Sequence, residues 1–249
     1  MYSYSQVGCF HNCPYQWKLR YKNRLRTLPN QDASNALYAG TALHTGLEKG
    51  LKEALEQFYS NFYVTTDEVI NEAIKLEIMI PKARAVVPDG EHEVKLITKD
   101  FIGFIDLLVP VGENEYDIWD FKYSNAIDRY MESDQLHIYK AKFEETHPGK
   151  KIRKLKYLFV PKTQIRQKKT ETLFQFRQRL IATLNDMEVT VMEVEFDESK
   201  VKSFENGISD IESATDYPKV ESPLCRWCDY ENYCKNGVTY EIVGGDIDA

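Results

Sequence analysis

Four residues have the types and surroundings that metal chemistry needs: His44, Asp106, Asp120 and Lys122. Both aspartates lie within short apolar runs, where a lone carboxylate is costly unless something pairs with it. Asp120 and Lys122 are two positions apart, so on a strand their side chains point to the same face of the sheet. Two carboxylates on neighbouring strands can converge on Mg²⁺ or Mn²⁺, which prefers carboxylate and water oxygens and tolerates an imidazole. The pattern therefore predicts a divalent-metal site.

The histidine and a pair of helical residues would complete such a site. His44 lies on a predicted long helix, and Gln135 and Tyr139 lie one turn apart on another predicted helix. A bound metal would lower the pKa of a water molecule and stabilise the charge on a phosphate under attack. Lys122 would add a cation beside that phosphate and help to orient or deprotonate the water. Each residue alone is commonplace, but the combination in this order favours a metal-dependent site.

Hydrophobic periodicity indicates the elements that must position these residues. Apolar positions at three- to four-residue steps predict helices at 4–21, from a cap at Ser34 through Phe58, from 67 to about 80 with Pro81 as the stop, and at 132–145, 172–187 and 198–214. Runs rich in β-branched and aromatic residues predict strands at 94–98, 101–109, 116–121, 155–160 and 189–196, the first three as an antiparallel meander. This order predicts an α/β or α+β core with one mixed sheet flanked by helices.

The size and composition of the chain set outer limits. Its 249 residues and 43% hydrophobic content suit one large domain over residues 1–249 or one domain with an appendage. No stretch approaches the roughly 18 apolar residues that span a bilayer, and the N-terminal segment lacks an apolar core and a small-residue cleavage site. We therefore expect a cytoplasmic location and no membrane association.

Charge is unevenly distributed along the chain. The formal net charge of −7 argues against a simple DNA-coating protein. Residues 150–169, however, hold nine Lys or Arg and no acid, and a second basic run over 18–26 is accompanied by Tyr15, Trp17 and Tyr21. Such stripes suit local binding of a phosphate backbone or are solvated faces. The aromatic residues could stack on unpaired bases or belong to the core.

An odd number of cysteines points to metal or cluster ligation rather than to disulfides in a cytoplasmic chain. The five are Cys9, Cys13, Cys225, Cys228 and Cys234. The last three form a C-x2-C-x5-C pattern, and four-coordinate zinc or an iron–sulfur cluster needs a fourth ligand. Candidates for that ligand lie at the other end of the chain: Cys13, Cys9 and, more weakly, His11.

A series of four motifs resembles that of RecB-like nucleases in the PD-(D/E)XK superfamily: G-x-x-x-H, G-x-x-D, D-x-K and Q-x-x-x-Y. The resemblance spans Ser3 to Cys234 and implies a single nuclease domain with a restriction-endonuclease-like core. It implies metal binding by His44, Asp106 and Asp120, catalysis by Asp106, Asp120 and Lys122, and DNA-backbone contact or site support by Gln135 and Tyr139. The second acidic position is often Glu in the family, whereas Asp120 is shorter.

The cysteines extend this resemblance. The segments Ser3–Gln6 and Cys13–Tyr15 resemble the N-terminal signature of the family, which favours Cys13 over Cys9 as the fourth ligand. A remote cysteine with C-x2-C-x5-C resembles the iron–sulfur clasp of the AddB nuclease domain and of CRISPR-associated RecB-like exonucleases. The resemblance thus implies a structural [4Fe–4S] cluster, with Zn²⁺ as the alternative, in a clasp of residues 1–26 and 218–236. Its ligands would be Cys13, Cys225, Cys228 and Cys234.

The activity implied by the resemblance is Mg²⁺- or Mn²⁺-dependent hydrolysis of single-stranded DNA or DNA ends, in recombination, repair or phage- and CRISPR-type DNA processing. The chain has no Walker A pattern, so a helicase or recombinase partner would be a separate protein. Two other classes stay open: a non-catalytic nucleic-acid-binding protein and a structural iron–sulfur protein, each retaining the nuclease fold. An RNA substrate also stays open, because no sequence feature separates it from DNA.

Overall fold

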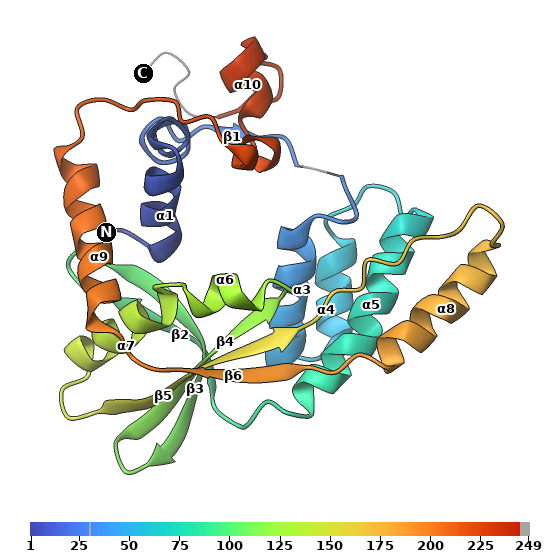
Figure 1. Cartoon of the computed structure of the whole chain (residues 1–249), viewed down its shortest axis with the longest axis horizontal. Coiled ribbons are helices and arrows are strands. Elements are labelled where there is room, and N and C mark those ends of the chain that lie inside the picture. Colours follow the sequence, from blue (N-terminus) through green and yellow to red (C-terminus); the bar gives the residue numbers. More distant parts are fainter. Residues whose placement is uncertain (30, 245–249) are drawn as a thin grey trace.

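The computed structural model describes residues 1–29 and 31–244 and centres on a five-stranded sheet (Figure 1). The strand order is β2 (Glu91–Ile97), β3 (Ile102–Gly112), β4 (Glu115–Tyr123), β5 (Lys151–Val160) and β6 (Thr190–Val194). The first three form an antiparallel meander, β5 joins β4 in parallel, and β6 pairs with β5 antiparallel. The predicted mixed sheet of an α/β protein is confirmed.

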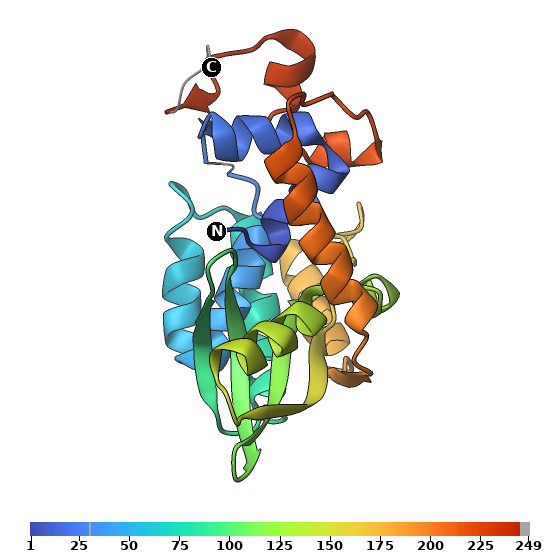
Figure 2. The same cartoon turned by 90° about the vertical axis from the view of Figure 1, so that its left-hand side faces the viewer.

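Helices cover both faces of this sheet (Figures 1 and 2). One face packs on α3 (Ala36–Glu48), α4 (Leu51–Tyr59), α5 (Asp67–Arg84) and α8 (Leu173–Asn185). The other face packs on α1 (Tyr4–Asn12), α7 (Gln135–Thr146) and α9 (Glu198–Ser213), with the short α6 (Ile127–Met131) before α7. Leu107 belongs to the first core and Leu108 to the second, because successive strand side chains point to opposite faces. Within the described residues, every helix is too short or too polar to cross a bilayer.

The two ends of the chain meet in a layer beyond the sheet, at the top of Figures 1 and 2. This terminal layer consists of α2 (Pro14–Trp17), the π-helical turn Lys18–Lys22, the paired strands β1 (Arg26–Thr27) and β7 (Ile242–Val243), the 3-10 turn Pro223–Trp227 and α10 (Glu231–Asn236). Tyr230 is buried there with Leu19 and Leu25, and its hydroxyl donates to the Leu25 carbonyl oxygen at 2.8 Å. Residues from the beginning and the end of the chain therefore pack on one another.

The long helix predicted from Ser34 is wrong in two respects. It is split into α3 and α4 at Gly50, whose φ of 127° favours glycine over other residues. Its N-cap is Asn35, whose side chain accepts the N–H of Leu37 at 2.9 Å, because the hydroxyl of Ser34 donates to Asp32 instead. Local glycine geometry and a competing side-chain bond thus override the periodic pattern.

Two predicted boundaries around prolines are also wrong. The helix predicted over 4–21 is interrupted at Cys13, which is extended ahead of Pro14, as steric clash before proline requires. α5 runs on through Pro81 to Arg84, although an internal proline removes a helical hydrogen bond. Burial of Ala83 and a hydrogen bond from the Arg84 guanidinium to the Gly46 carbonyl oxygen at 2.8 Å hold this last turn.

Two glycines of α3 give a matched test of the packing between α3 and α5. A Cβ at Gly46 would lie 2.7 Å from Cδ1 of the buried Ile80, whereas a Cβ at Gly40 would have nothing within 4 Å. We expect Gly46→Ala to lower the free energy of unfolding by about 1–3 kcal/mol through overpacking. Gly40→Ala should raise it by up to about 1 kcal/mol through helix propensity. Urea denaturation measures both values, and equal stability of the two variants would contradict the close approach.

Candidate functional site

The backbone N–H and carbonyl of Phe121 on β4 hold two of the predicted site residues. The β3–β4 ladder ends at the pair Leu107 and Trp119. Beyond that pair, the Phe121 N–H donates to Oδ2 of Asp106 at 2.7 Å, and the Phe121 carbonyl oxygen lies 3.0 Å from Nε2 of His44. Since Nε2 must donate its proton to that carbonyl, Nδ1 is the ring nitrogen left to bind a cation.

Nδ1 of His44 faces two acids. It lies 3.4 Å from Oδ1 of Asp106 and 4.0 Å from Oε1 of Glu93. One ligand atom from each of the three residues lies within 4.8 Å of the other two. An imidazole nitrogen and carboxylate oxygens are donors that Mg²⁺ or Mn²⁺ accepts, so these residues fit a divalent cation.

The protonation of His44 depends on the same neighbours. Burial alone would lower the pKa of His44, but the hydrogen bond and the charge of Asp106 raise it to about 9. The ring is therefore protonated at neutral pH when only Asp106 and Glu93 face it. A cation that binds Nδ1 must displace that proton, because a metal ligand binds in its deprotonated form.

Glu93 is the site residue that sequence reasoning missed. It lies on β2 between the paired residues His92 and Val94, and its φ of 54° is rare for a residue with a side chain. Burial and the charge of Asp106 raise the pKa of Glu93. Such backbone strain persists where the surroundings enforce it and is common at functional sites. Nothing in the sequence marks this glutamate, because neither its register opposite Asp106 nor its φ can be inferred from residue types.

Asp120 is buried beside this group but interacts mainly with Lys122. The Asp120 side chain is 1% exposed, and its Oδ2 lies 2.6 Å from Nζ of Lys122. Its Oδ1 has no hydrogen-bond partner among the residues the structure describes. Burial raises the pKa of Asp120, with the nearby charge of Asp106 acting in the same direction. The structure thus brings His44 and Asp106 together with Glu93, and pairs Asp120 with the predicted catalytic lysine.

Gln135 and Tyr139 hold Lys122 from the α7 side. Nζ of Lys122 donates to Oε1 of Gln135 at 2.9 Å, and Nε2 of Gln135 donates to the Tyr139 hydroxyl at 3.1 Å. Lys122 Nζ also lies 5.2 Å from the ring centroid of Tyr130, which is cation–π distance. Tyr139 is buried, so its position favours support of the site over direct contact with a substrate.

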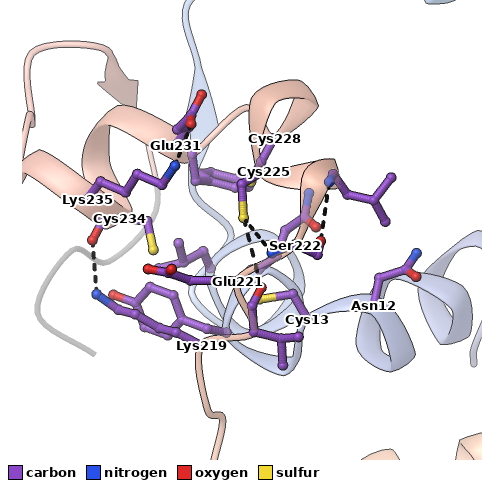
Figure 3. Close-up of a pocket in the computed structure, with 16 residues that line it drawn as sticks. Asn12, Cys13, Lys219, Glu221, Ser222, Cys225, Cys228, Glu231, Cys234 and Lys235 are labelled. Atoms are coloured by element: carbon purple, nitrogen blue, oxygen red, sulfur yellow. Dashed lines mark hydrogen bonds and ion pairs between the residues drawn. The ribbon is translucent and has the colours of Figure 1, made fainter.

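A second candidate site is a cavity of about 410 Å³ in the terminal layer (Figure 3). Its lining includes four cysteines from the two ends of the chain: Cys13, Cys225, Cys228 and Cys234. Cys9 and His11, the other candidates for a fourth ligand, do not line it. Burial raises the pKa of the Cys9 thiol and also that of Cys228, so the lining of the cavity, rather than the pKa, sets Cys9 apart.

Part of the first basic run is ion-paired, and part of the aromatic run is buried. Arg153, Lys154 and Lys156 of β5 form ion pairs with acids of β4 and β6. The segment after β5, 161–170, carries three further exposed basic residues, Arg166, Lys168 and Lys169. Trp17 is buried and stacks on Tyr217 with ring centroids 5.8 Å apart, so it is a core residue and does not present its face to bases.

A charge-neutralising substitution tests the role of Glu93. Because the carboxylate is a candidate ligand, Glu93→Gln should weaken Mn²⁺ binding at least about tenfold in calorimetry. The metal-free variant should be more stable than the parent by roughly 0.5 kcal/mol or less, since burial and Asp106 disfavour the ionised Glu93 and solvent screens its half-exposed side chain. Glu91→Gln, on the exposed part of the same strand, is the control. Unchanged Mn²⁺ affinity in Glu93→Gln would remove Glu93 from the site.

Comparison with known proteins identifies the family to which residues 1–235 belong. No curated protein matches it. Among solved structures, a 2.19 Å crystal structure from Eubacterium rectale, described as "Putative exonuclease", has a TM-score of 0.59 and 12% sequence identity, over 90% of this chain and 86% of that one. At this identity the likeness shows a shared fold. The family model of the PD-(D/E)XK nuclease superfamily matches residues 1–235. The chain therefore belongs to the PD-(D/E)XK nuclease superfamily.

Proposed function

We propose that this protein is a metal-dependent DNA nuclease of the RecB-like type that hydrolyses phosphodiester bonds with Mg²⁺ or Mn²⁺. The observation that carries the proposal is that two pairs of ionisable residues, His44 with Asp106 and Lys122 with Asp120, lie around Phe121. His44 and Asp106, hydrogen-bonded to its carbonyl and its N–H respectively, present Nδ1 and Oδ1 to a cation position. Lys122 and Asp120, the residues on either side of it in the sequence, form a buried ion pair beside that position.

Each residue has a role that follows from its contacts. A bound cation would supply a water of lowered pKa and neutralise charge on the phosphate. His44, Asp106 and Glu93 would hold that cation. Burial alone would lower the pKa of Lys122, but the charge of Asp120 raises it, so the amine stays protonated. Lys122 therefore serves as a fixed positive charge that orients the water and stabilises the phosphate, rather than as a base.

The substrate is proposed to be single-stranded DNA or a DNA end. The exposed basic residues of 161–170 supply charge for a phosphate backbone at a protein whose net charge is −7. The proposed context is recombination, repair or phage- and CRISPR-type DNA processing, with any helicase or recombinase as a separate chain.

Asp120→Asn tests the nuclease proposal. The change keeps the size of the side chain but removes the charge that pairs with Lys122 and raises its pKa, so the amine loses its fixed position and we expect cleavage to fall by about 100-fold or more. The assay uses 5′- and 3′-labelled single- and double-stranded DNA, and matched RNA, with Mn²⁺ and with chelator. Asp186→Asn, at the exposed end of α8, is the control. Wild-type cleavage by Asp120→Asn would contradict the assignment, and a brown protein that cleaves none of these substrates would favour the structural iron–sulfur alternative.

We further propose that Cys13, Cys225, Cys228 and Cys234 hold a [4Fe–4S] cluster with a structural role. The four thiols line one cavity, and Ser222 N–H donates toward Cys225 Sγ at 3.5 Å, a contact suited to a thiolate. A C-x2-C-x5-C pattern completed by a cysteine from the opposite end of the chain resembles the iron–sulfur clasp of the AddB nuclease domain, and this resemblance favours a cluster over zinc. The cluster would tie residues 1–26 to residues 218–236 within one nuclease domain.

Two cysteine variants test the cluster. Protein purified without oxygen should be brown and contain about four iron atoms per chain. Cys234→Ser should lose iron and make the terminal segments sensitive to limited proteolysis, because the cross-link between them is gone. Cys9→Ser, which alters a cysteine outside the cavity, should keep its iron. Colourless protein with one zinc per chain, or iron loss in Cys9→Ser alone, would overturn the proposed ligand set.

A further inference from the structure

Helix α1 connects the cysteine cavity to the catalytic core. Its C-terminal end leads into Cys13, which lines the cavity. Just before its N-terminal end, Tyr2 forms two backbone hydrogen bonds with the β2–β3 turn. The Tyr2 N–H donates to the Asp100 carbonyl oxygen at 2.6 Å, and the Ile102 N–H donates to the Tyr2 carbonyl oxygen at 2.9 Å. One helix thus spans from the terminal layer to the sheet, as Figure 2 shows.

The helix has little freedom to shift along this path. α1 lies against α9, and a Cβ at Gly207 of α9 would come within 2.5 Å of Val7 Cγ1 on α1. α9 itself leads through Tyr217 toward the C-terminal cysteines, and Tyr217 stacks on Trp17 next to α1. The position of α1 is therefore set jointly by the terminal layer and by α9.

A chain of hydrogen bonds runs from α1 to the catalytic lysine. The Tyr4 hydroxyl lies 2.9 Å from Oγ of Ser133, in the turn before α7. The same Oγ accepts the backbone N–H of Gln135 at 3.2 Å. Oε1 of Gln135 accepts from Nζ of Lys122 at 2.9 Å.

Ser133 and Tyr139 fix Gln135 at both ends. Asp134, the residue before α7, makes no side-chain capping bond, so the Ser133 hydroxyl is what satisfies the first N–H of the helix. At its far end the Gln135 amide donates to the Tyr139 hydroxyl. The amide therefore has one orientation, and that orientation places the acceptor for Lys122.

We propose that Tyr4 and Ser133 are positioning residues that transmit the placement of α1 by the cysteine layer to Lys122. The expected effect on catalysis rests on the proposed function. The expected effect on the order of α7 rests on the hydrogen bonds alone. Loss of either hydroxyl frees the start of α7 and lets Gln135 rotate, so Lys122 leaves its position beside Asp120 for part of the time. Substrate binding is unaffected, because neither residue contacts the cation position.

We call the hydrogen-bonded series Tyr4, Ser133, Gln135 and Lys122 the relay. Tyr4→Phe, Ser133→Ala and the double variant test it by steady-state kinetics on labelled single-stranded DNA with saturating Mn²⁺. Each single change should lower kcat by about three- to tenfold, the effect of one neutral hydrogen bond, with KM within about twofold. The double variant should be no slower than the worse single variant, since both act through one path. Ser133→Thr, which keeps the hydroxyl, should restore kcat, and Ser5→Ala on the exposed side of α1 should leave it unchanged. Unchanged kcat in both single variants, or fully additive losses, would overturn the relay.

Hydrogen exchange tests the structural link without activity. Amide exchange at residues 135–139 should be about tenfold faster in Tyr4→Phe and in Cys234→Ser, and no faster when the two changes are combined. Unaltered exchange in Tyr4→Phe would refute the relay even if wild-type protein cleaves DNA. Faster exchange in a protein that cleaves no nucleic acid would retain the relay and refute the nuclease proposal.

Discussion

The need to satisfy the backbone N–H and carbonyl of Phe121 is the constraint on which the candidate site depends. Where the β3–β4 ladder stops, this N–H and carbonyl would be left unsatisfied in a buried setting, at a penalty of about 1–3 kcal/mol each. Asp106 accepts the N–H and His44 donates to the carbonyl. The same two hydrogen bonds therefore satisfy the backbone and fix the positions of the two side chains. The sheet supplies the end of the ladder, and α3, packed on the same face, supplies the histidine. If β3 and β4 stayed paired as far as Phe121, its backbone would no longer hold Asp106 and His44, and both candidate ligands would lose their fixed positions.

Around Phe121 the protein accepts local strain and charge repulsion. Glu93 holds a positive φ, and burial and the charge of Asp106 both disfavour its ionised form. Asp120 is buried with one oxygen unpartnered in the described structure. These features lower stability in the metal-free protein and make sense when a cation supplies positive charge, the usual exchange of stability for function. The terminal layer, which packs the chain ends together, and the two flanking helix layers offset that strain by burying apolar surface elsewhere.

Sequence patterns predict the scaffold better than the local geometry. Period-two and helical periodicity report burial, which is why the meander and the order of helices and strands agree with the structure. Gly50 and Pro81 are ambiguous in sequence, since only the φ angle and the tertiary contacts decide whether a helix breaks. Spacing alone predicts that Asp120 and Lys122 share a face of the sheet, whereas the grouping of His44 with Asp106 follows from the resemblance to RecB-like nucleases. Glu93 could not, because its part in the site arises from register and from a backbone angle that residue types do not encode.

The most direct measurement of the central claim is the anomalous scattering of Mn²⁺ in crystals of the protein. The expected result is one strong peak within bonding distance of His44 Nδ1 and Asp106 Oδ1, with Nε2 of His44 still donating to the Phe121 carbonyl and Lys122 still beside Asp120. A peak bound to Nε2 of His44, or Mn²⁺ bound only away from Asp106, would contradict the role assigned to the Phe121 backbone.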